Sequence, residues 1–150
     1  MGQPWRADVT IAENTISTNG FGPEGFGAAN RGIGISAWIG ADLVAVVRDN
    51  TISQVRDGIR SFGGAAEFRI EAGTDFCTLD LTIERNTISN VTEDGLDLRI
   101  WASSGIATVN GTYVVRDNRI EDYSASGMYL YAGRLAPTGR SISRSTSTTT

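Results

Sequence analysis

The chain has 150 residues, which is enough for one domain with a buried core, and 40% of them are hydrophobic. All 13 basic residues are arginine, so the sequence offers no lysine for a Schiff base and no histidine for general-base or metal chemistry. A net charge of −4 disfavours nucleic acid and anionic membrane surfaces as partners.

The single cysteine and the distribution of hydrophobic residues further limit the function classes open to the chain. The single cysteine, Cys77, stands among apolar residues, so we expect a buried structural thiol. Neither a signal peptide nor a hydrophobic run long enough to cross a bilayer is visible, and membrane insertion is not expected.

One short phrase recurs along the chain, an asparagine followed two residues later by an isoleucine. The spacing between successive asparagines is 36, 36 and 32 residues. The asparagines are Asn14, Asn50, Asn86 and Asn118, and the isoleucines are Ile16, Ile52, Ile88 and Ile120. A fixed period of this length predicts a repeat architecture.

Each phrase follows a stretch in which apolar and polar residues alternate, as on a half-buried strand. These stretches are residues 9–11, 43–47, 79–83 and 112–115. Three phrases are followed by a glycine and a second short strand, at Gly58-Ile59, Gly95-Leu96 and Gly127-Met128. In the first copy a Gly-rich insertion, residues 18–31, precedes the equivalent Gly34-Ile35.

The alternation predicts an all-β fold, a right-handed parallel β-helix of about four coils. Stacked coils would bring equivalent residues about 4.8 Å apart, so the isoleucines form one inward column. The asparagines would form a hydrogen-bonded ladder at a tight corner. Two further inward columns are Ile11, Val47, Ile83 and Val115, and Val9, Ala45, Leu81 and Tyr113.

These phrases, with the glycine-led strands after them, resemble the parallel β-helix repeat of the pectate lyase-like superfamily, including its NosD-type and carbohydrate-active branches. The resemblance covers residues 7–131. It implies an extracellular or cell-surface location and a carbohydrate partner, and it is stronger evidence for fold than for function.

Charged residues before each asparagine test the stacking. The residues two positions before the asparagines form one column, which consists of Ala12, Arg48, Glu84 and Arg116. The residues one position before the asparagines form a second column, which consists of Glu13, Asp49, Arg85 and Asp117. The sign alternates over the last three coils in both columns, so arginine and acid from neighbouring coils are expected to pair. Glu13 beside Asp49 breaks the pattern.

The predicted domain is residues 1–140, and residues 141–150 form a Ser/Thr-rich tail or a closing strand. A solenoid of four coils has two open ends, which expose apolar core and unpaired backbone. Three explanations stay open: a fragment of a longer β-helix, capping by other means, and end-to-end stacking of the chain with itself.

The resemblance to pectate lyase-like proteins also implies that a ligand would lie along one outer face, and we expect this to be the face of the glycine-led strands. One predicted outward column is Ser36, Arg60, Asp97 and Tyr129, and the next is Trp38, Phe62, Arg99 and Tyr131. Aromatic rings stack on sugars and arginine forks accept carboxylates, so an acidic polysaccharide is a second expected partner. The alternative is that loops 63–78 and 101–111 fold back and bury the aromatics.

Catalytic chemistry has weaker support. Asp94 and Asp97 match the Asp-Gly-x-Asp phrase of the related polygalacturonases, but the family's other motifs are missing. Arg60 and Arg99 are candidate bases for a lyase, although arginine is a poor base near neutral pH. Glu93 with Asp94 offers a weak Ca²⁺ site, and no other metal or cofactor is expected.

The sequence therefore favours a non-catalytic structural or carbohydrate-interacting module, part of a surface assembly or of a longer protein. An enzyme fragment, either a polysaccharide lyase or a glycoside hydrolase, is the alternative. A flat Thr/Ser face at residues 15–17, 51–53 and 87–89 makes an ice-binding solenoid a third hypothesis, which Arg119 and Glu121 disfavour.

Overall fold

The computed structural model describes residues 5–17, 31–37, 40–65, 76–102, 108–134 and 146–149. Side chains are described for these residues except at 62–65, 76, 101–102, 108–109, 133–134 and 146–149. Every regular element in these ranges is a β-strand, and no helix there is long and apolar enough to cross a membrane.

The strands form three parallel sheets, and successive strands along the chain visit the sheets in turn. Sheet A contains β1 (Trp5–Ala12), β4 (Ala41–Arg48), β7 (Phe76–Glu84), β10 (Thr108–Arg116) and β13 (Thr146–Thr149). Sheet B contains β2 (Thr15–Ser17), β5 (Thr51–Val55), β8 (Thr87–Val91) and β11 (Arg119–Tyr123). Sheet C contains β3 (Arg31–Ala37), β6 (Asp57–Ala65), β9 (Leu96–Ala102) and β12 (Met128–Arg134).

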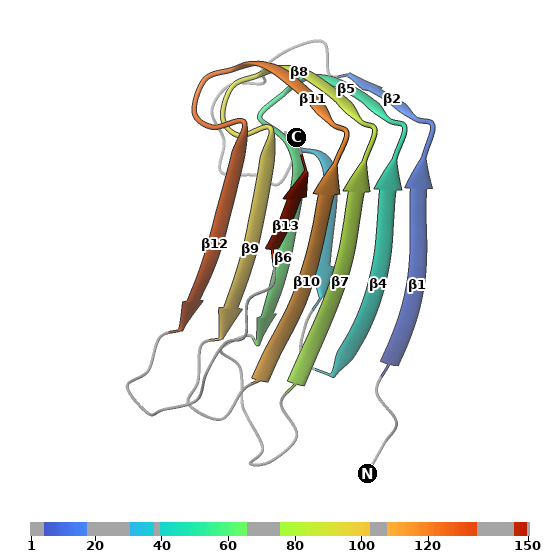
Figure 1. The fold of residues 1–150 in the computed structure, drawn as a ribbon, viewed down its shortest axis with the longest axis vertical. Coiled ribbons are helices and arrows are strands. Elements are labelled where there is room, and N and C mark those ends of the chain that lie inside the picture. Colours follow the sequence, from blue (N-terminus) through green and yellow to red (C-terminus); the bar gives the residue numbers. More distant parts are fainter. Residues whose placement is uncertain are drawn as a thin grey trace.

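The chain rises through sheet A, crosses the top of the molecule in sheet B and descends in sheet C (Figure 1). Each circuit then begins again one strand further along the axis. This is the parallel β-helix of about four coils that the repeat predicts.

The core lies inside the three sheets and consists of stacked columns of apolar side chains. Ile52 and Ile88 lie opposite each other in sheet B, flanked by Ile16 and Ile120 in the outer coils. The two central isoleucines are fully buried, whereas the outer two are only partly covered. Burial therefore falls toward both ends of the solenoid, because the end coils have a neighbour on one side only.

The corner between sheets A and B carries the asparagine ladder. The Asn50 side-chain nitrogen lies 2.9 Å from the Asn86 Oδ1, and the Asn50 backbone N–H donates to the same oxygen over 3.0 Å. The Asn50 amide nitrogen also lies 2.9 Å from the Arg48 carbonyl and 3.0 Å from the Ile11 carbonyl. One buried amide thus serves its own turn and the two neighbouring coils, which leaves little unpaired polar surface at the corner.

The first corner of all four coils, and the second corner of the last three, contain a residue with a left-handed backbone. Glu13, Asp49, Arg85 and Asp117 have φ between 53° and 60° at the first corner, and Gln54, Asn90 and Asp122 have φ between 53° and 57° at the second. None of these residues is β-branched, and β-branched residues tolerate this region least. The spacing of the repeat alone does not predict this left-handed backbone.

A glycine column follows the second corner because the coils approach each other closely there. A Cβ on Gly95 would lie 2.3 Å from Ile120 Cγ2 and 2.6 Å from the Gly127 carbonyl oxygen. Gly32 and Gly58 face Ile52 and Ile88 in the same way, at 2.4 and 2.5 Å. Each glycine thus makes room for the isoleucine of the following coil.

The structure corrects one alignment in the first coil. Arg31 pairs with Asp57 and Ile33 with Ile59, so the glycine equivalent to Gly58 is Gly32. The predicted equivalent, Gly34, instead lies opposite Arg60, on the outer face. The prediction was wrong by two residues because a shift of two along a strand keeps the same alternation.

Glycine substitutions test this packing. Gly95→Ala should lower the free energy of unfolding by about 1–3 kcal/mol, because the added methyl group overpacks against Ile120. Gly34→Ala is the matched control, since nothing lies within 4 Å of its Cβ position. Urea denaturation followed by circular dichroism measures both; equal losses would contradict the packing described for Gly95.

Candidate functional site

The outer face of sheet C gathers the residues that the sequence singled out. Arg60, Asp97 and Tyr129 stand in one column, and Phe62, Arg99 and Tyr131 stand in the next. The first-coil members of these columns are Gly34 and Ser36 rather than the predicted Ser36 and Trp38. Trp38 lies outside the described residues, and only the backbone of Phe62 is described.

Asp97 is the centre of this face. Although its column points outward, its side chain is only 1% exposed. Arg60 Nε lies 3.1 Å from one carboxylate oxygen, and Arg99 Nε lies 2.6 Å from the other. Both predicted ligand-binding arginines are therefore engaged by a carboxylate of the protein itself, a strong charge-assisted arrangement.

Two more aspartates lie beside Asp97, at the start of the same sheet. Asp57 and Asp94 each stand directly before a glycine of the close-packed column, in the second and third coils. Asp57, Asp94 and Asp97 are all buried, and each offers a carboxylate oxygen within 4.8 Å of the others. Burial raises the pKa of Asp57, and the charge of Arg60 opposes that rise.

Glu93 does not belong to this cluster. It forms an ion pair of 2.8 Å with Arg56, and both side chains are largely exposed. The two residues of the expected Glu93–Asp94 Ca²⁺ site are therefore separated. Asp94 lies instead beside Asp57, which was not among the predicted site residues. The signal was available, since Asp57-Gly58 and Asp94-Gly95 are the same dipeptide in successive coils.

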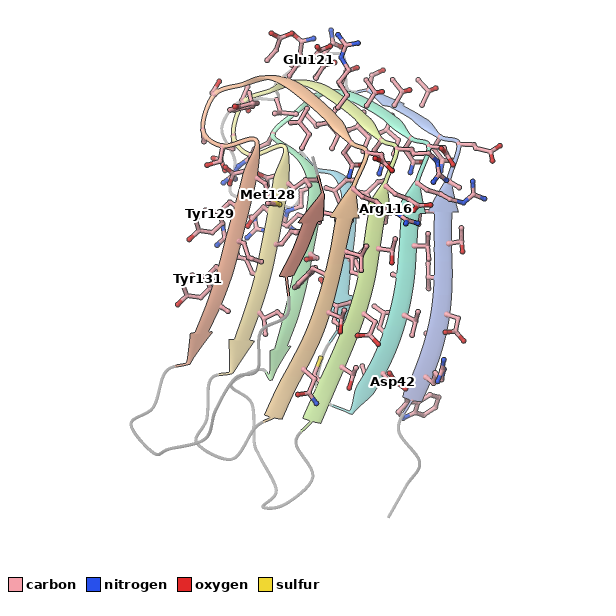
Figure 2. All side chains as sticks on the ribbon, in the orientation of Figure 1. Asp42, Arg116, Glu121, Met128, Tyr129 and Tyr131 are labelled. Carbon is pink, nitrogen blue, oxygen red and sulfur yellow. The ribbon has the colours of Figure 1, made fainter. Side chains whose placement is uncertain are left out.

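The two tyrosines of β12 remain open to solvent. Tyr129 is 39% exposed and Tyr131 is 43% exposed, and Figure 2 shows both projecting from the outer side of the strand. The Arg99 guanidinium lies 5.3 Å from the centre of the Tyr129 ring, within the range of a cation–π contact. These two rings are thus not buried by folded-back loops.

A chain of ion pairs runs along the A–B corner across all four coils. Arg85 Nε and Nη2 hold Asp49 at 2.8 and 3.0 Å, and Arg85 Nη1 lies 2.6 Å from Glu84. Arg116 Nε continues the chain to Glu84 over 2.7 Å. Arg48 contacts Asp49 at 2.7 Å and Glu13 at 3.4 Å.

The charge columns thus pair differently from the simple expectation. Two inter-coil pairs lie within a column, Asp49–Arg85 and Glu84–Arg116. Arg48 was expected to reach Glu84 but turns to its sequence neighbour Asp49 and to Glu13 of the first coil. Glu13, which breaks the alternation, is accommodated through this diagonal contact.

A second candidate site is the open end of the core at the last coil. A hollow of about 290 Å³ lies there, lined by Leu96, Val115, Ile120 and Met128 together with the corner residues 116–118. Met128 is 43% exposed and Tyr123 is 47% exposed, large values for apolar side chains. Figure 2 places Met128 on the inner side of β12, away from Tyr129 and Tyr131. The end of the solenoid therefore exposes apolar surface that an additional coil would cover.

The comparisons with known proteins add no relative. No family model matches the sequence, no curated protein matches it, and no solved structure matches the fold.

The ion-pair chain makes stability sensitive to acid. Hydrogen bonds from Arg85, and then from Arg48, lower the pKa of Asp49 from 3.8 to about 2. A carboxylate with a lowered folded-state pKa stabilises the fold fully above its unfolded pKa, about 3.9, and loses that contribution as the pH falls through the folded value. The difference in free energy of unfolding between the native chain and Asp49→Asn should therefore be constant above pH 5 and shrink between about pH 4 and 2. Urea titrations at each pH measure it, and a gap independent of pH would contradict the assignment.

Proposed function

We propose that this chain is a structural β-helix module that stacks head to tail with a second copy of itself. The observation that carries the proposal is the direction of the asparagine ladder. In each of three coils the asparagine backbone N–H donates to the Oδ1 of the asparagine in the following coil, over 2.9–3.0 Å.

This direction leaves complementary groups at the two ends. Among the described residues, nothing accepts from the backbone N–H of Asn118, and nothing donates to the Oδ1 of Asn14. If the fourth coil of one copy meets the first coil of the next, the Asn118 N–H reaches the Asn14 Oδ1 and the ladder continues. A buried unpaired polar group is costly, so completing the ladder favours this orientation.

The glycine and isoleucine columns show the same complementarity. Gly32, Gly58 and Gly95 each accommodate an isoleucine of the next coil, whereas the nearest atoms to a Cβ on Gly127 belong to the Tyr123 ring, at 3.4 Å. Ile16 of a second copy would occupy the corresponding space over Gly127. The apolar hollow lined by Val115 and Ile120 would then be closed by Ile11 and Ile16 of that copy.

Such an interface is heterologous, because the surface at one end differs from the surface at the other. Heterologous contacts that do not close into a ring generate filaments. We therefore expect open linear assemblies, in which β-strands of sheets B and C continue from one copy to the next.

Strand β13 is the last strand of sheet A and covers the edge of β10 at which a second copy would stack. It pairs in parallel with Tyr113–Arg116 of β10. In a stacked assembly, residues 9–12 of the following copy would pair with this same stretch of β10, so they would take the place of β13. Assembly through sheet A requires β13 to leave. Removal of residues 141–150 should therefore raise the extent of assembly at a given protein concentration, as measured by light scattering. Reduced assembly of the truncated chain would contradict this competition between β13 and the first strand of the next copy.

A substitution at the junction gives the main test of stacking. Gly127→Ala should leave the free energy of unfolding unchanged, because its Cβ meets the Tyr123 ring only at ordinary contact distance. It should weaken association about tenfold or more, since the methyl group would overpack against Ile16 of the next copy. Analytical ultracentrifugation over a concentration series measures association, with Gly34→Ala as the control.

The charge pattern offers a variant with the opposite effect. Stacking places Asp117 of one copy beside Glu13 of the next, and like charges directly opposite are destabilising. Glu13→Arg would make the column alternate without a break, from the arginine to Asp49, Arg85 and Asp117. This variant should assemble at lower concentration than the native chain. A strictly monomeric native chain that Glu13→Arg and tail removal both leave monomeric would overturn the proposal.

A second candidate function, carbohydrate binding, is favoured by the exposed pair Tyr129 and Tyr131. Alternate residues on a strand lie about 6.6 Å apart on one face, so the two rings offer a short stacking platform. This surface is the one that a carbohydrate-active member of the pectate lyase-like superfamily would use. Because Asp97 already engages Arg60 and Arg99, hydroxyl-rich rather than strongly acidic sugars suit it better.

A glycan-binding experiment distinguishes carbohydrate binding from end-to-end stacking. Tyr129→Ala with Tyr131→Ala should abolish retention of the chain on immobilised polysaccharide while leaving its assembly unchanged. Gly127→Ala should do the reverse. Turnover of a uronate polymer that depends on Arg60 or Arg99 would instead favour a lyase.

A further inference from the structure

We propose that Asp57, Asp94 and Asp97 form a calcium-binding site that joins the second and third coils at the start of sheet C. Asp57 begins β6, Asp94 lies just before β9, and Asp97 lies within β9. The site is separate from the end-to-end junction and does not depend on the proposed stacking.

The geometry of the three carboxylates fits a single ion. One oxygen from each residue lies within 4.8 Å of the other two. Oxygen ligands stand about 2.3–2.6 Å from Ca²⁺, so two ligands on opposite sides of the ion are about 5 Å apart. The three oxygens can therefore contact one calcium ion with only small adjustments of the side chains.

An unpaired atom gives independent support. Asp57 Oδ1 is buried and no group of the described residues hydrogen-bonds to it, and the whole side chain is 1% exposed. Nearly all buried polar atoms in folded proteins are paired, and a buried carboxylate oxygen left alone costs more than a neutral group does. A cation beside this oxygen supplies the missing partner.

The surrounding charges leave room for such an ion. Arg60 and Arg99 are directed to the two oxygens of Asp97. At Asp57 the arginines lie on the other oxygen, with Arg60 Nη1 at 3.5 Å and Arg31 Nε at 3.9 Å from Oδ2. Among the described residues, no hydrogen bond reaches Asp57 Oδ1 and no ion pair reaches the carboxylate of Asp94, so oxygen atoms on that side of the cluster are available to a cation.

The ligand set selects the class of metal. All three side chains offer oxygen, and the chain has no histidine to favour zinc or another transition metal. Mg²⁺ demands near-octahedral geometry and retains its waters, whereas Ca²⁺ accepts irregular sites that are completed by carbonyl groups and water. Calcium is therefore the better fit for a cluster set into two rigid coils.

Binding would tighten the second corner of the solenoid. The two strands joined by the ion already share the backbone bonds from Gly58 N to Asp94 O and from Ile59 N to Gly95 O, over 3.1 and 3.0 Å. An ion that binds the folded chain but not the unfolded chain raises stability by mass action. Calcium should therefore raise the melting temperature in proportion to the logarithm of its concentration.

The experiment uses the full chain after treatment with a chelator and dialysis. Thermal unfolding is followed by circular dichroism at 0–10 mM CaCl₂, with MgCl₂ as the comparison, and affinity is measured by isothermal titration calorimetry. The native chain should show one calcium site and a rise in melting temperature of a few degrees. Asp57→Asn should weaken calcium binding at least tenfold.

The control is Asp80→Asn, which removes a partly exposed carboxylate from β7 in sheet A, away from both the aspartate cluster and the end-to-end junction, and should leave the calcium response intact. Melting of each variant in the absence of calcium shows whether it folds, so a lost response can be assigned to the site. An unchanged melting temperature at 10 mM calcium, or an equal response from the native chain and Asp57→Asn, would overturn the proposal.

Discussion

The rest of the structure depends on the bond from one asparagine to the next. At the two central A–B corners, the buried amides of Asn50 and Asn86 each donate to a carbonyl of their own turn, to a carbonyl of the preceding coil and to the Oδ1 of the next asparagine, all within 3.0 Å. A turn of one left-handed residue followed by this amide can be stacked repeatedly without leaving polar groups unpaired. The spacing of the four asparagines therefore fixes where every coil begins, and the isoleucine and glycine columns follow from that register.

The same regularity explains why the chain's charged residues are mostly structural. Arg85, Asp49 and Glu84 lie within an ion-pair chain along one corner, and Arg60 and Arg99 are both held by Asp97. The exposed pairs along the corner contribute little individually, but they discriminate between stacking registers because a shifted coil would bring like charges together. Arginine suits this task, since its planar fork can contact two carboxylates at once.

Two features are not explained by stacking alone, and they carry the proposals. The ladder has a direction, so its ends are complementary, and the last coil exposes an apolar hollow beside Met128. The carboxylates of Asp57, Asp94 and Asp97 lie together in a buried cluster, and no described group hydrogen-bonds to Asp57 Oδ1. The hollow lies at an end of the solenoid, and the aspartates lie at the second corner and the start of sheet C. At both places the side chains are less constrained by the need to fill a repeating apolar core.

The sequence by itself determined the coil repeat and three inward columns. Coils of similar length stack equivalent residues on one another in neighbouring parallel strands, so a repeated apolar residue forms a column in the core. It also predicted that Arg60, Asp97 and Arg99 share one outer face. Only the tertiary structure decided the register of the first coil, since the insertion before Gly32 hides a shift of two residues. The tertiary structure also brought Asp57 to Asp94 and turned Arg48 toward Glu13. Such contacts depend on side-chain direction and burial across coils, quantities that period and alternation do not contain.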